Sequence, residues 1–379
     1  MSDLISYKFR VYPNRQTQGK IQHQLDLARW LYNRLLEEMN SAKEDGRTTS
    51  RTDTQAMIVK LKEEHPELKE VHSKVLQMVN NQLWYNTRVL ASLKRRGKKV
   101  GKQRFKGKYR YRSLNYNQTG VRTEADRLRL PKFGDMKIIL HRETVGEIKA
   151  IIIKREKSGK WFAIVMANSP TDPLDPTGRV VGIDVVLRHF LTDSDGQHIE
   201  DPRYMKQSML NIKQCHRRVS RKEKGSKNRE KAKIKLSRAY EKLHNQRGDF
   251  HHKLARYYVN NYDVLSVEEL EIARMIRDRE YSSGIADVGW GNFNRMFAYK
   301  AERAGRKYVR VDPAGTSQEY DHGDMDRDYN ASLNTLERGL SGLGRACAPA
   351  DIVPLRRLKR ALASTVVETG SPLLKPVRV

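Results

Sequence analysis

The sequence predicts a multidomain α+β chain, in which a small β-sheet or barrel, interrupted by a helical bundle, precedes an α/β domain. Three observations support this prediction. Alternating apolar residues open the chain, and further short strand-like segments follow between residues 128 and 167. Apolar residues at helical spacing occupy most of residues 16–93. After a proline-rich stretch, short apolar strands alternate with longer helical segments, which is typical of an α/β domain.

The first quarter of the chain contains one strand and several helices. Residues 5–12 alternate between apolar and polar side chains, as a half-buried strand does, and Pro13 ends this pattern. The period then changes to that of a helix, and we predict helices at residues 16–39, 54–64 and 68–93. The helices therefore form a bundle that is inserted after one strand.

Strand signals return in the next segment. We predict strands at residues 128–131, 136–140, 148–154 and 160–167, of which the last two form a hairpin. Together with the first strand they indicate a small β-barrel or sheet. Residues 168–178 contain three prolines and two aspartates and are the strongest candidate for a linker between domains.

The second half alternates strands with helices. We predict strands at residues 179–184, 190–192, 262–267 and 307–311. We predict helices within the basic region 205–259 and at residues 288–304 and 330–338, with Gly339 ending the last helix. The segment from residue 340 onward is punctuated by proline and glycine, and we expect it to be poorly ordered.

The charge of the chain indicates a polyanionic partner. The sequence contains 74 Lys and Arg against 45 Asp and Glu, which gives a net charge of +29. Such a surplus suits nucleic acid, because each Lys or Arg near a phosphate releases a bound counterion. No stretch approaches the roughly 20 apolar residues of a membrane helix. Cys215 and Cys347 form neither a disulfide framework nor a zinc-ligand set, so we expect an intracellular protein.

Two basic segments are candidate nucleic-acid-binding sites. Residues 94–112 hold eleven Lys or Arg and no acid, with Phe105, Tyr109 and Tyr111 interleaved, so that aromatic rings could stack on bases; the alternative is a solvated, disordered loop. Residues 213–238 hold twelve Lys or Arg and two Glu, which suits either a charged helical hairpin or a nucleic-acid face. The candidate residues are Lys94, Arg95, Arg96, Lys98, Lys99, Lys102, Arg104, Lys106, Lys108, Arg110, Arg221, Lys222, Lys227 and Arg229.

Three acidic residues stand at the ends of predicted elements. Asp184 ends the strand VVGID, Glu268 ends the strand VLSVE, and Asp328 opens a helix in DRDYNA. In an α/β sheet, functional groups gather at the carboxyl ends of strands and the amino ends of helices. Three carboxylates there would repel one another unless a hard cation such as Mg²⁺ or Mn²⁺ lay between them. Two such ions could activate water and stabilise the leaving oxygen in phosphodiester hydrolysis.

Each of these acids alone has an ordinary structural explanation. An aspartate after a buried strand is most often a turn or cap residue, and Asp328 could simply interact with the helix dipole. Glu268 could form a surface ion pair. The ordered set in a very basic chain nevertheless favours a shared metal site. On periodicity alone, four rival carboxylates remain, namely Asp193, Glu269, Asp312 and Asp326.

Short motifs along the whole chain match one protein family. They lie at residues 7–13, 29–30, 32–33, 130–132, 158–161, 182–184, 220–222, 225–229, 246–253, 267–268, 326–331 and 367–372. With these motifs the sequence resembles TnpB, also called OrfB, a transposon-encoded family of RNA-guided nucleases related to type V CRISPR nucleases. The basic helical stretch and the DRDxNA motif are the specific parts of this resemblance, whereas GID alone is not specific.

The resemblance implies an RNase H-like domain of the RuvC type, preceded by a β-barrel wedge domain with an inserted helical recognition domain. It implies a guide RNA, a double-stranded DNA target read mostly by guide pairing, and cleavage with Mg²⁺ or Mn²⁺. Asp184, Glu268 and Asp328 would be both catalytic and metal-binding. The implied domains are 1–13 (first wedge strand), 14–118 (recognition), 119–170 (wedge barrel), 177–339 (RuvC) and 340–379 (tail).

The sequence departs from the family pattern at two places. The family usually carries a four-cysteine zinc ribbon between its TSQ and DRD motifs, but here residues 319–325 read EYDHGDM. A structural zinc site needs about four ligands, so we predict no zinc. The ribbon normally helps to place the target strand over the active site, so its loss weighs against cleavage. Val186 also stands where the family usually has glycine, which allows a close backbone approach.

Three functions are compatible with these observations. The first is a transposon-associated RNA-guided DNA endonuclease, which the intact acids favour. The second is a cleavage-deficient guided DNA-binding protein or repressor, which the missing ribbon favours. The third is a basic RNA-binding protein, which would make the three acids a coincidence. We expect a cytoplasmic, nucleoid-associated protein of prokaryotic type with no membrane partner, and the sequence does not indicate an oligomeric state.

Overall fold

The computed structural model describes seven parts of the chain, residues 2–117, 122–124, 126–171, 173–185, 189–269, 289–313 and 326–342. The chain divides into two compact units, Met1–Pro170 and Thr171–Val379, which we describe separately. The described residues do not include Val186, the TSQ motif, residues 319–325 or most of the predicted tail.

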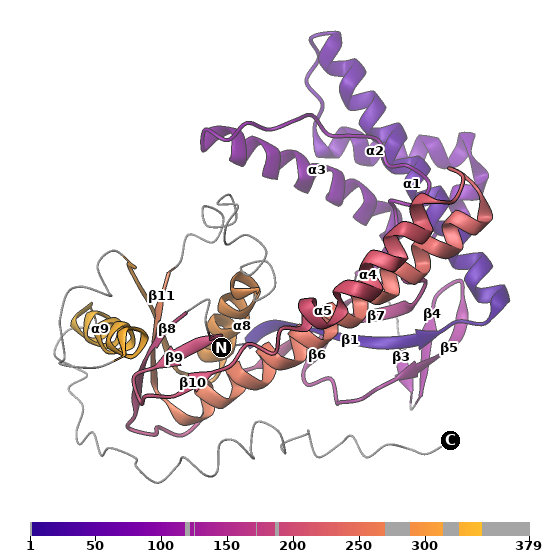
Figure 1. Ribbon diagram of the computed structural model, residues 1–379. Coiled ribbons are helices and arrows are strands. Elements are labelled where there is room, and N and C mark those ends of the chain that lie inside the picture. Colours follow the sequence, from indigo (N-terminus) through magenta and orange to yellow (C-terminus); the bar gives the residue numbers. More distant parts are fainter. Residues whose placement is uncertain are drawn as a thin grey trace. The chain divides into compact units, whose positions relative to one another are not determined.

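The first unit is built on a curled, seven-stranded antiparallel sheet with the order β2-β6-β7-β1-β5-β4-β3 (Figure 1). The strands are β1 (Ser2–Tyr12), β2 (Ser113–Asn117), β3 (Arg122–Glu124), β4 (Arg127–Leu130), β5 (Gly134–Ile139), β6 (Glu147–Arg155) and β7 (Trp161–Pro170). The first strand is the centre of the sheet, because β1 pairs with β7 along most of its length and with β5 at its end. The sequence did not predict β2 or β3.

Helices follow β1 in the sequence and separate it, along the chain, from the other strands of its sheet. They are α1 (Arg15–Glu44), α2 (Arg51–Glu64), the short 3₁₀ helix η1 (Pro66–Glu70) and α3 (Ser73–Arg95). The single helix predicted for residues 68–93 is wrong, because two helices meet there. The backbone is extended at Val71, and the Nδ1 atom of His72 accepts a hydrogen bond from the backbone N–H of Lys74, which begins α3 as a helix cap.

One apolar core joins these helices to the sheet. It contains fully buried residues of β1, α1, α3, β2 and β7, such as Phe9, Leu31, Leu76, Leu114 and Val165. Tyr111 belongs to the same core, is only 9% exposed and lies against Tyr32. Its predicted role in base stacking is therefore wrong.

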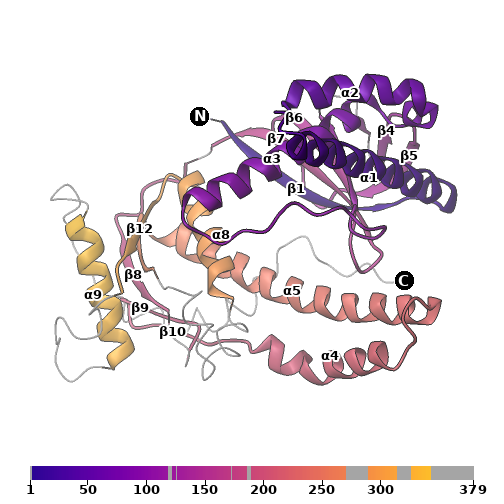
Figure 2. The ribbon, with the colours of Figure 1, turned by 90° about the horizontal axis from the view of Figure 1, so that it is seen from above.

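The second unit contains a five-stranded sheet with the order β10-β9-β8-β11-β12 (Figure 2). Its strands are β8 (Val180–Asp184), β9 (Leu191–Asp193), β10 (His198–Ile199), β11 (Val264–Glu268) and β12 (Lys307–Val311). β8, β11 and β12 are parallel, while β9 and β10 form an antiparallel hairpin at the edge. Among the described residues, no helix of either unit is long and apolar enough to cross a membrane.

Helices cover both faces of this sheet, but they pack against the two faces in different ways. Helices α5 (Lys227–Asn261) and α8 (Trp290–Arg303) lie on one face, and α9 (Arg327–Gly342) lies on the other (Figure 2). The first face holds a large apolar cluster that includes Tyr258, Phe293 and Val267. None of the described α9 side chains belongs to that cluster. The contact of α9 with the sheet instead depends on close backbone approach.

Two glycines permit this close approach. A Cβ atom on Gly182 of β8 would lie 2.1 Å from the carbonyl oxygen of Ser332, and a Cβ on Gly339 would lie 2.0 Å from the hydroxyl of Ser266 in β11. Gly339 lies within α9, which continues to Gly342. The prediction that Gly339 ends this helix is wrong, because the residue serves helix–sheet contact and not a helix cap.

The basic region predicted at residues 205–259 forms a helical hairpin, α4 (Tyr204–Ser220) followed by α5, whose helices lie side by side (Figure 1). The Ser226 hydroxyl caps α5, and the Arg229 guanidinium donates a hydrogen bond to the carbonyl of Lys222 across the turn. Few residues of the hairpin are buried before α5 reaches the sheet; Ile212, Cys215 and Leu243 are the buried ones before His251. Most of its charged surface faces solvent.

Candidate active site

The two strand-end carboxylates lie at the same edge of the second sheet. Asp184 is the last residue of β8, and Glu268 is the last residue of β11. These strands are parallel neighbours, and their register pairs Ile183 with Val267. The next residue of each strand is the acid, so the two side chains leave the sheet together, and a side-chain hydrogen bond joins them.

The glycine contact of α9 brings the third acid to this edge. Gly182 lies two residues before Asp184, so both positions face α9, since alternate residues of a strand share a face. Ser332, which contacts Gly182, lies four residues after Asp328, so these two share a face of α9. Asp328 is close enough for its charge to raise the pKa of Asp184.

Burial and crowding make this a high-energy place for negative charge. Asp184 and Glu268 are only 8% and 7% exposed. Burial, then the charge and hydrogen bond of Glu268, then the charge of Asp328 raise the pKa of Asp184 to about 8, against a smaller opposing effect of the Val185 backbone N–H. At neutral pH the Asp184–Glu268 pair therefore retains a proton.

This donor set has the chemistry of a divalent-cation site. A hard cation binds carboxylate oxygens and would relieve the repulsion that now holds a proton on the pair. Among the described residues, however, no three Asp, Glu, His or Cys side chains lie close enough together to hold a metal ion. The pair is assembled, whereas Asp328 would have to move closer to complete a three-carboxylate site.

The rival carboxylates lie in other surroundings. Glu269 forms a 2.9 Å ion pair with Arg310 on the surface. Asp326 caps α9, because its side chain accepts hydrogen bonds from the backbone N–H groups of Asp328 and Tyr329. Asp193 pairs with Ile183 across the strands and faces α5, away from α9. The backbone carbonyl of the fourth rival, Asp312, accepts a hydrogen bond from the guanidinium of Arg338 in α9.

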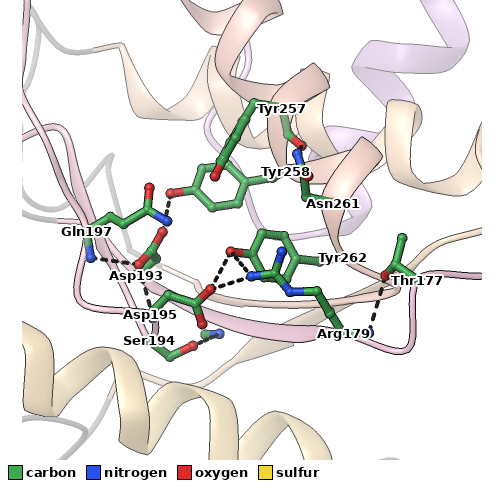
Figure 3. A network of polar contacts seen from close by, with 11 residues as sticks. Thr177, Arg179, Asp193, Ser194, Asp195, Gln197, Tyr257, Tyr258, Asn261 and Tyr262 are labelled. Carbon is green, nitrogen blue, oxygen red and sulfur yellow. Dashed lines mark hydrogen bonds and ion pairs between the residues drawn. The ribbon is translucent and has the colours of Figure 1, made fainter. Parts of the chain in front are cut away.

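Asp193 instead anchors a buried network between the β9–β10 turn and α5 (Figure 3). Its carboxylate accepts hydrogen bonds from the backbone N–H groups of Asp195 and Gln197 and from the hydroxyl of Tyr258. Complete burial outweighs these donors and raises the pKa of Asp193 to about 6. Next to it, Asp195 accepts from both Tyr262 and Arg179. This network holds α5 against the sheet.

Sequence reasoning missed a pair of histidines near the carboxylates. Thr192 of β9 pairs with Asp184, and its hydroxyl lies 3.0 Å from Nδ1 of His198. The ring of His189 lies 5.0 Å from that of His198. The Asp195-Gly196 turn indicates a hairpin, but a two-residue turn would place His198 opposite Asp193. The observed loop spans residues 194–196 and places His198 opposite Thr192.

The first basic segment is held in place by the helices of the first unit. The Gln103 side chain donates to the Leu83 carbonyl, and Asn33 both accepts from the backbone N–H of Lys106 and donates to its carbonyl. These bonds argue against a disordered loop. Of the fourteen predicted nucleic-acid-binding residues, all are exposed except Lys106 and Arg229, which are partly buried. Phe105 and Tyr109 are 55% and 64% exposed.

Three protein-family models match the chain. OrfB_IS605, described as "Probable transposase", matches residues 163–279, and the Cas12f1-like TNB domain matches residues 290–324. HTH_OrfB_IS605, described as a helix-turn-helix domain, matches residues 1–47, whose described part forms β1 and α1. The similarity to the OrfB family that the motifs predict is thereby confirmed.

Individual relatives match over most of the chain. A Streptomyces pristinaespiralis protein is 27% identical over 95% of each chain, and InsQ of Escherichia coli (strain K12) is 28% identical over 84% of this chain and 83% of its own. Both are provisionally named RNA-guided DNA endonucleases. A Cas12f1 chain, solved with sgRNA and target DNA, covers 88% of this chain and 98% of its own with a TM-score of 0.53 and 13% identity. Its fold is therefore similar.

Proposed function

We propose that this relative of the OrfB transposon proteins is an RNA-guided DNA endonuclease whose nuclease centre is Asp184, Glu268 and Asp328. One observation carries the proposal. Two buried carboxylates share a hydrogen bond at the ends of adjacent parallel strands, and the charge of Asp328 acts on them from α9. The strand order and the position of α9 suit an RNase H-like domain of the RuvC type, which would cover residues 177–339.

The three acids would hold Mg²⁺ or Mn²⁺ at a DNA phosphodiester. When bound, the metal would activate a water molecule and stabilise the leaving oxygen. Asp184 and Glu268 supply a rigid pair of ligands, because both lie at the ends of buried strands. Asp328 would supply its ligand from the first turn of α9, on the face of the helix that lies against β8.

Guide RNA and target DNA are the partners that the relatives suggest. The charge of +29 and the exposed basic residues support binding of nucleic acid. In this proposal, the first unit comprises a wedge sheet and recognition helices that are inserted between β1 and β2. The predicted boundary at residue 118 moves to residue 112, because β2 belongs to the sheet. Guide pairing would read the target, while protein side chains would contact phosphates and a short flanking motif.

One observation favours the alternative of a guided DNA-binding protein that does not cleave. The described carboxylates do not form a ready three-ligand site. If Asp328 cannot close onto the pair, metal would bind weakly and the protein would remain on its target as a repressor.

A cleavage assay separates these functions. The full chain is purified, the RNA that accompanies it is sequenced, and guided cleavage of double-stranded DNA is measured with Mg²⁺. Asp184→Ala and Asp328→Ala should abolish cleavage, whereas Glu269→Gln, which changes the adjacent surface carboxylate, should not. Guided binding without cleavage supports the repressor, and the absence of any discrete RNA contradicts both guided functions.

A further inference from the structure

The row of side chains that contains Asp184 and Glu268 continues to the edge of the sheet. β9 pairs Thr192 with Asp184, and β10 pairs His198 with Thr192. Directly paired residues point to the same face, so one row crosses four strands and contains His198, Thr192, Asp184 and Glu268. At the ordinary strand spacing, the α-carbons of His198 and Asp184 lie about 10 Å apart.

The structure orients His198 within this row. Its Nδ1 atom is 3.0 Å from the hydroxyl of Thr192, which is completely buried and therefore has few alternative positions. The other ring nitrogen, Nε2, lies on the opposite side of the imidazole, and the residue is exposed. Nε2 is thus the atom of His198 that can meet a ligand.

His189 supports the same orientation from the other side. Its ring lies 5.0 Å from that of His198 with a tilt of 43°, and its Nδ1 is held 2.9 Å from Glu200. Glu200 is an exposed partner, with 70% of its side chain accessible. The Glu200 carboxylate accepts a hydrogen bond from Nδ1–H of His189 and so holds that ring in place. When the Thr192 hydroxyl donates to Nδ1 of His198, the hydrogen of this imidazole is on Nε2, which is then a donor.

We propose that His198, supported by His189, binds a phosphate of the DNA strand next to the phosphate at the carboxylate centre. Phosphate oxygens only accept hydrogen bonds, which suits an Nε2–H donor. His198 lies about two β-strand spacings from Asp184, a distance that fits a neighbouring nucleotide of the same DNA strand. Thr192 is then a positioning residue. This inference rests on the proposed nuclease function, because that function places the cleaved phosphate at Asp184.

The binding of this phosphate is tested by NMR on the full chain, labelled with ¹⁵N-histidine, in Ca²⁺. The ligand is a thymidine tetranucleotide, and the matched control is the same tetranucleotide with neutral methylphosphonate linkages. The Nε2 signal of His198, assigned by its absence in His198→Asn, should move saturably with the charged probe alone. A signal that stays in place overturns the proposal. Equal movement with the neutral probe also overturns it and indicates a contact with bases.

Two substitutions then test the role of Nε2 in cleavage. Asparagine keeps a polar atom near Thr192 but lacks Nε2, whereas glutamine carries an amide nitrogen at a similar reach. His198→Asn should raise KM about tenfold, the effect of one hydrogen bond to a charged group, while His198→Gln should remain within about twofold. Both variants should keep the thermal midpoint, which a merely structural role would lower. If the unsubstituted protein does not cleave, the proposed function fails, and the NMR result still decides the phosphate site.

Discussion

Gly182→Ala directly tests how Asp328 is positioned. The new Cβ would lie 2.1 Å from the Ser332 carbonyl oxygen and 2.7 Å from the backbone nitrogen of Leu336. Ordinary contacts need roughly 3.5 Å or more, and no side-chain rotation can relieve a clash with backbone. α9 must therefore move away by more than an ångström. Overpacking of this kind typically destabilises by about 1–3 kcal/mol, and we expect a value near the upper limit.

The assay is thermal unfolding with and without Mn²⁺. A loss of about 3 kcal/mol corresponds to a midpoint roughly 6–12 °C lower for a unit of this size. Mn²⁺ should also raise the midpoint less than in the unsubstituted protein, because Asp328 moves with α9. Gly248→Ala is the matched control, since Gly248 lies within α5 with open space around it, and alanine there should stabilise by about 1 kcal/mol. A Gly182→Ala variant with unchanged midpoint and unchanged Mn²⁺ response would refute this account of the α9 contact.

Three further predictions concern charge. The pKa of Asp193 is about 6 in the folded protein and about 3.9 in the unfolded chain, so the free energy of unfolding of the second unit should fall by about 3 kcal/mol as pH rises through that interval. Asp193→Asn should flatten this pH dependence, measured by urea unfolding. An unchanged pH dependence would contradict the burial argument. The Asp184–Glu268 pair retains a proton at pH 7, so Asp184→Asn should change metal-free stability by less than about 1 kcal/mol. The same substitution should abolish stabilisation by Mn²⁺, which reaches about 2.7 kcal/mol at a hundredfold excess over Kd, and retained stabilisation would exclude Asp184 as a ligand. Replacing the exposed Arg104 and Lys108 with Gln should lower the salt dependence of single-stranded DNA binding by about 0.7 per residue, measured by fluorescence anisotropy, and an unchanged slope would exclude both as phosphate contacts.

Local sequence patterns were sufficient where one element decides its own structure. The strands that end at Asp184 and Glu268 and the helix that begins near Asp328 are visible as short apolar runs with a polar terminus. Predictions failed where a tertiary contact overrides the local signal. Gly339 looks like a helix end but faces Ser266 across the α9 contact, and Tyr111 looks like a base-stacking residue but fills the core beside Tyr32.

The sequence by itself indicated a polyanionic partner, the similarity to the OrfB family and the three element ends, because charge, motifs and periodicity are properties of neighbouring residues. Only the tertiary structure decided which acids meet. The strand order makes β8 and β11 neighbours, and Asp193 lies on the face of the sheet that packs against α5. Gly182 allows α9, which carries Asp328, to approach the opposite face closely. It also revealed His198 in the same row. These relations join residues that are far apart along the chain, so no local period encodes them.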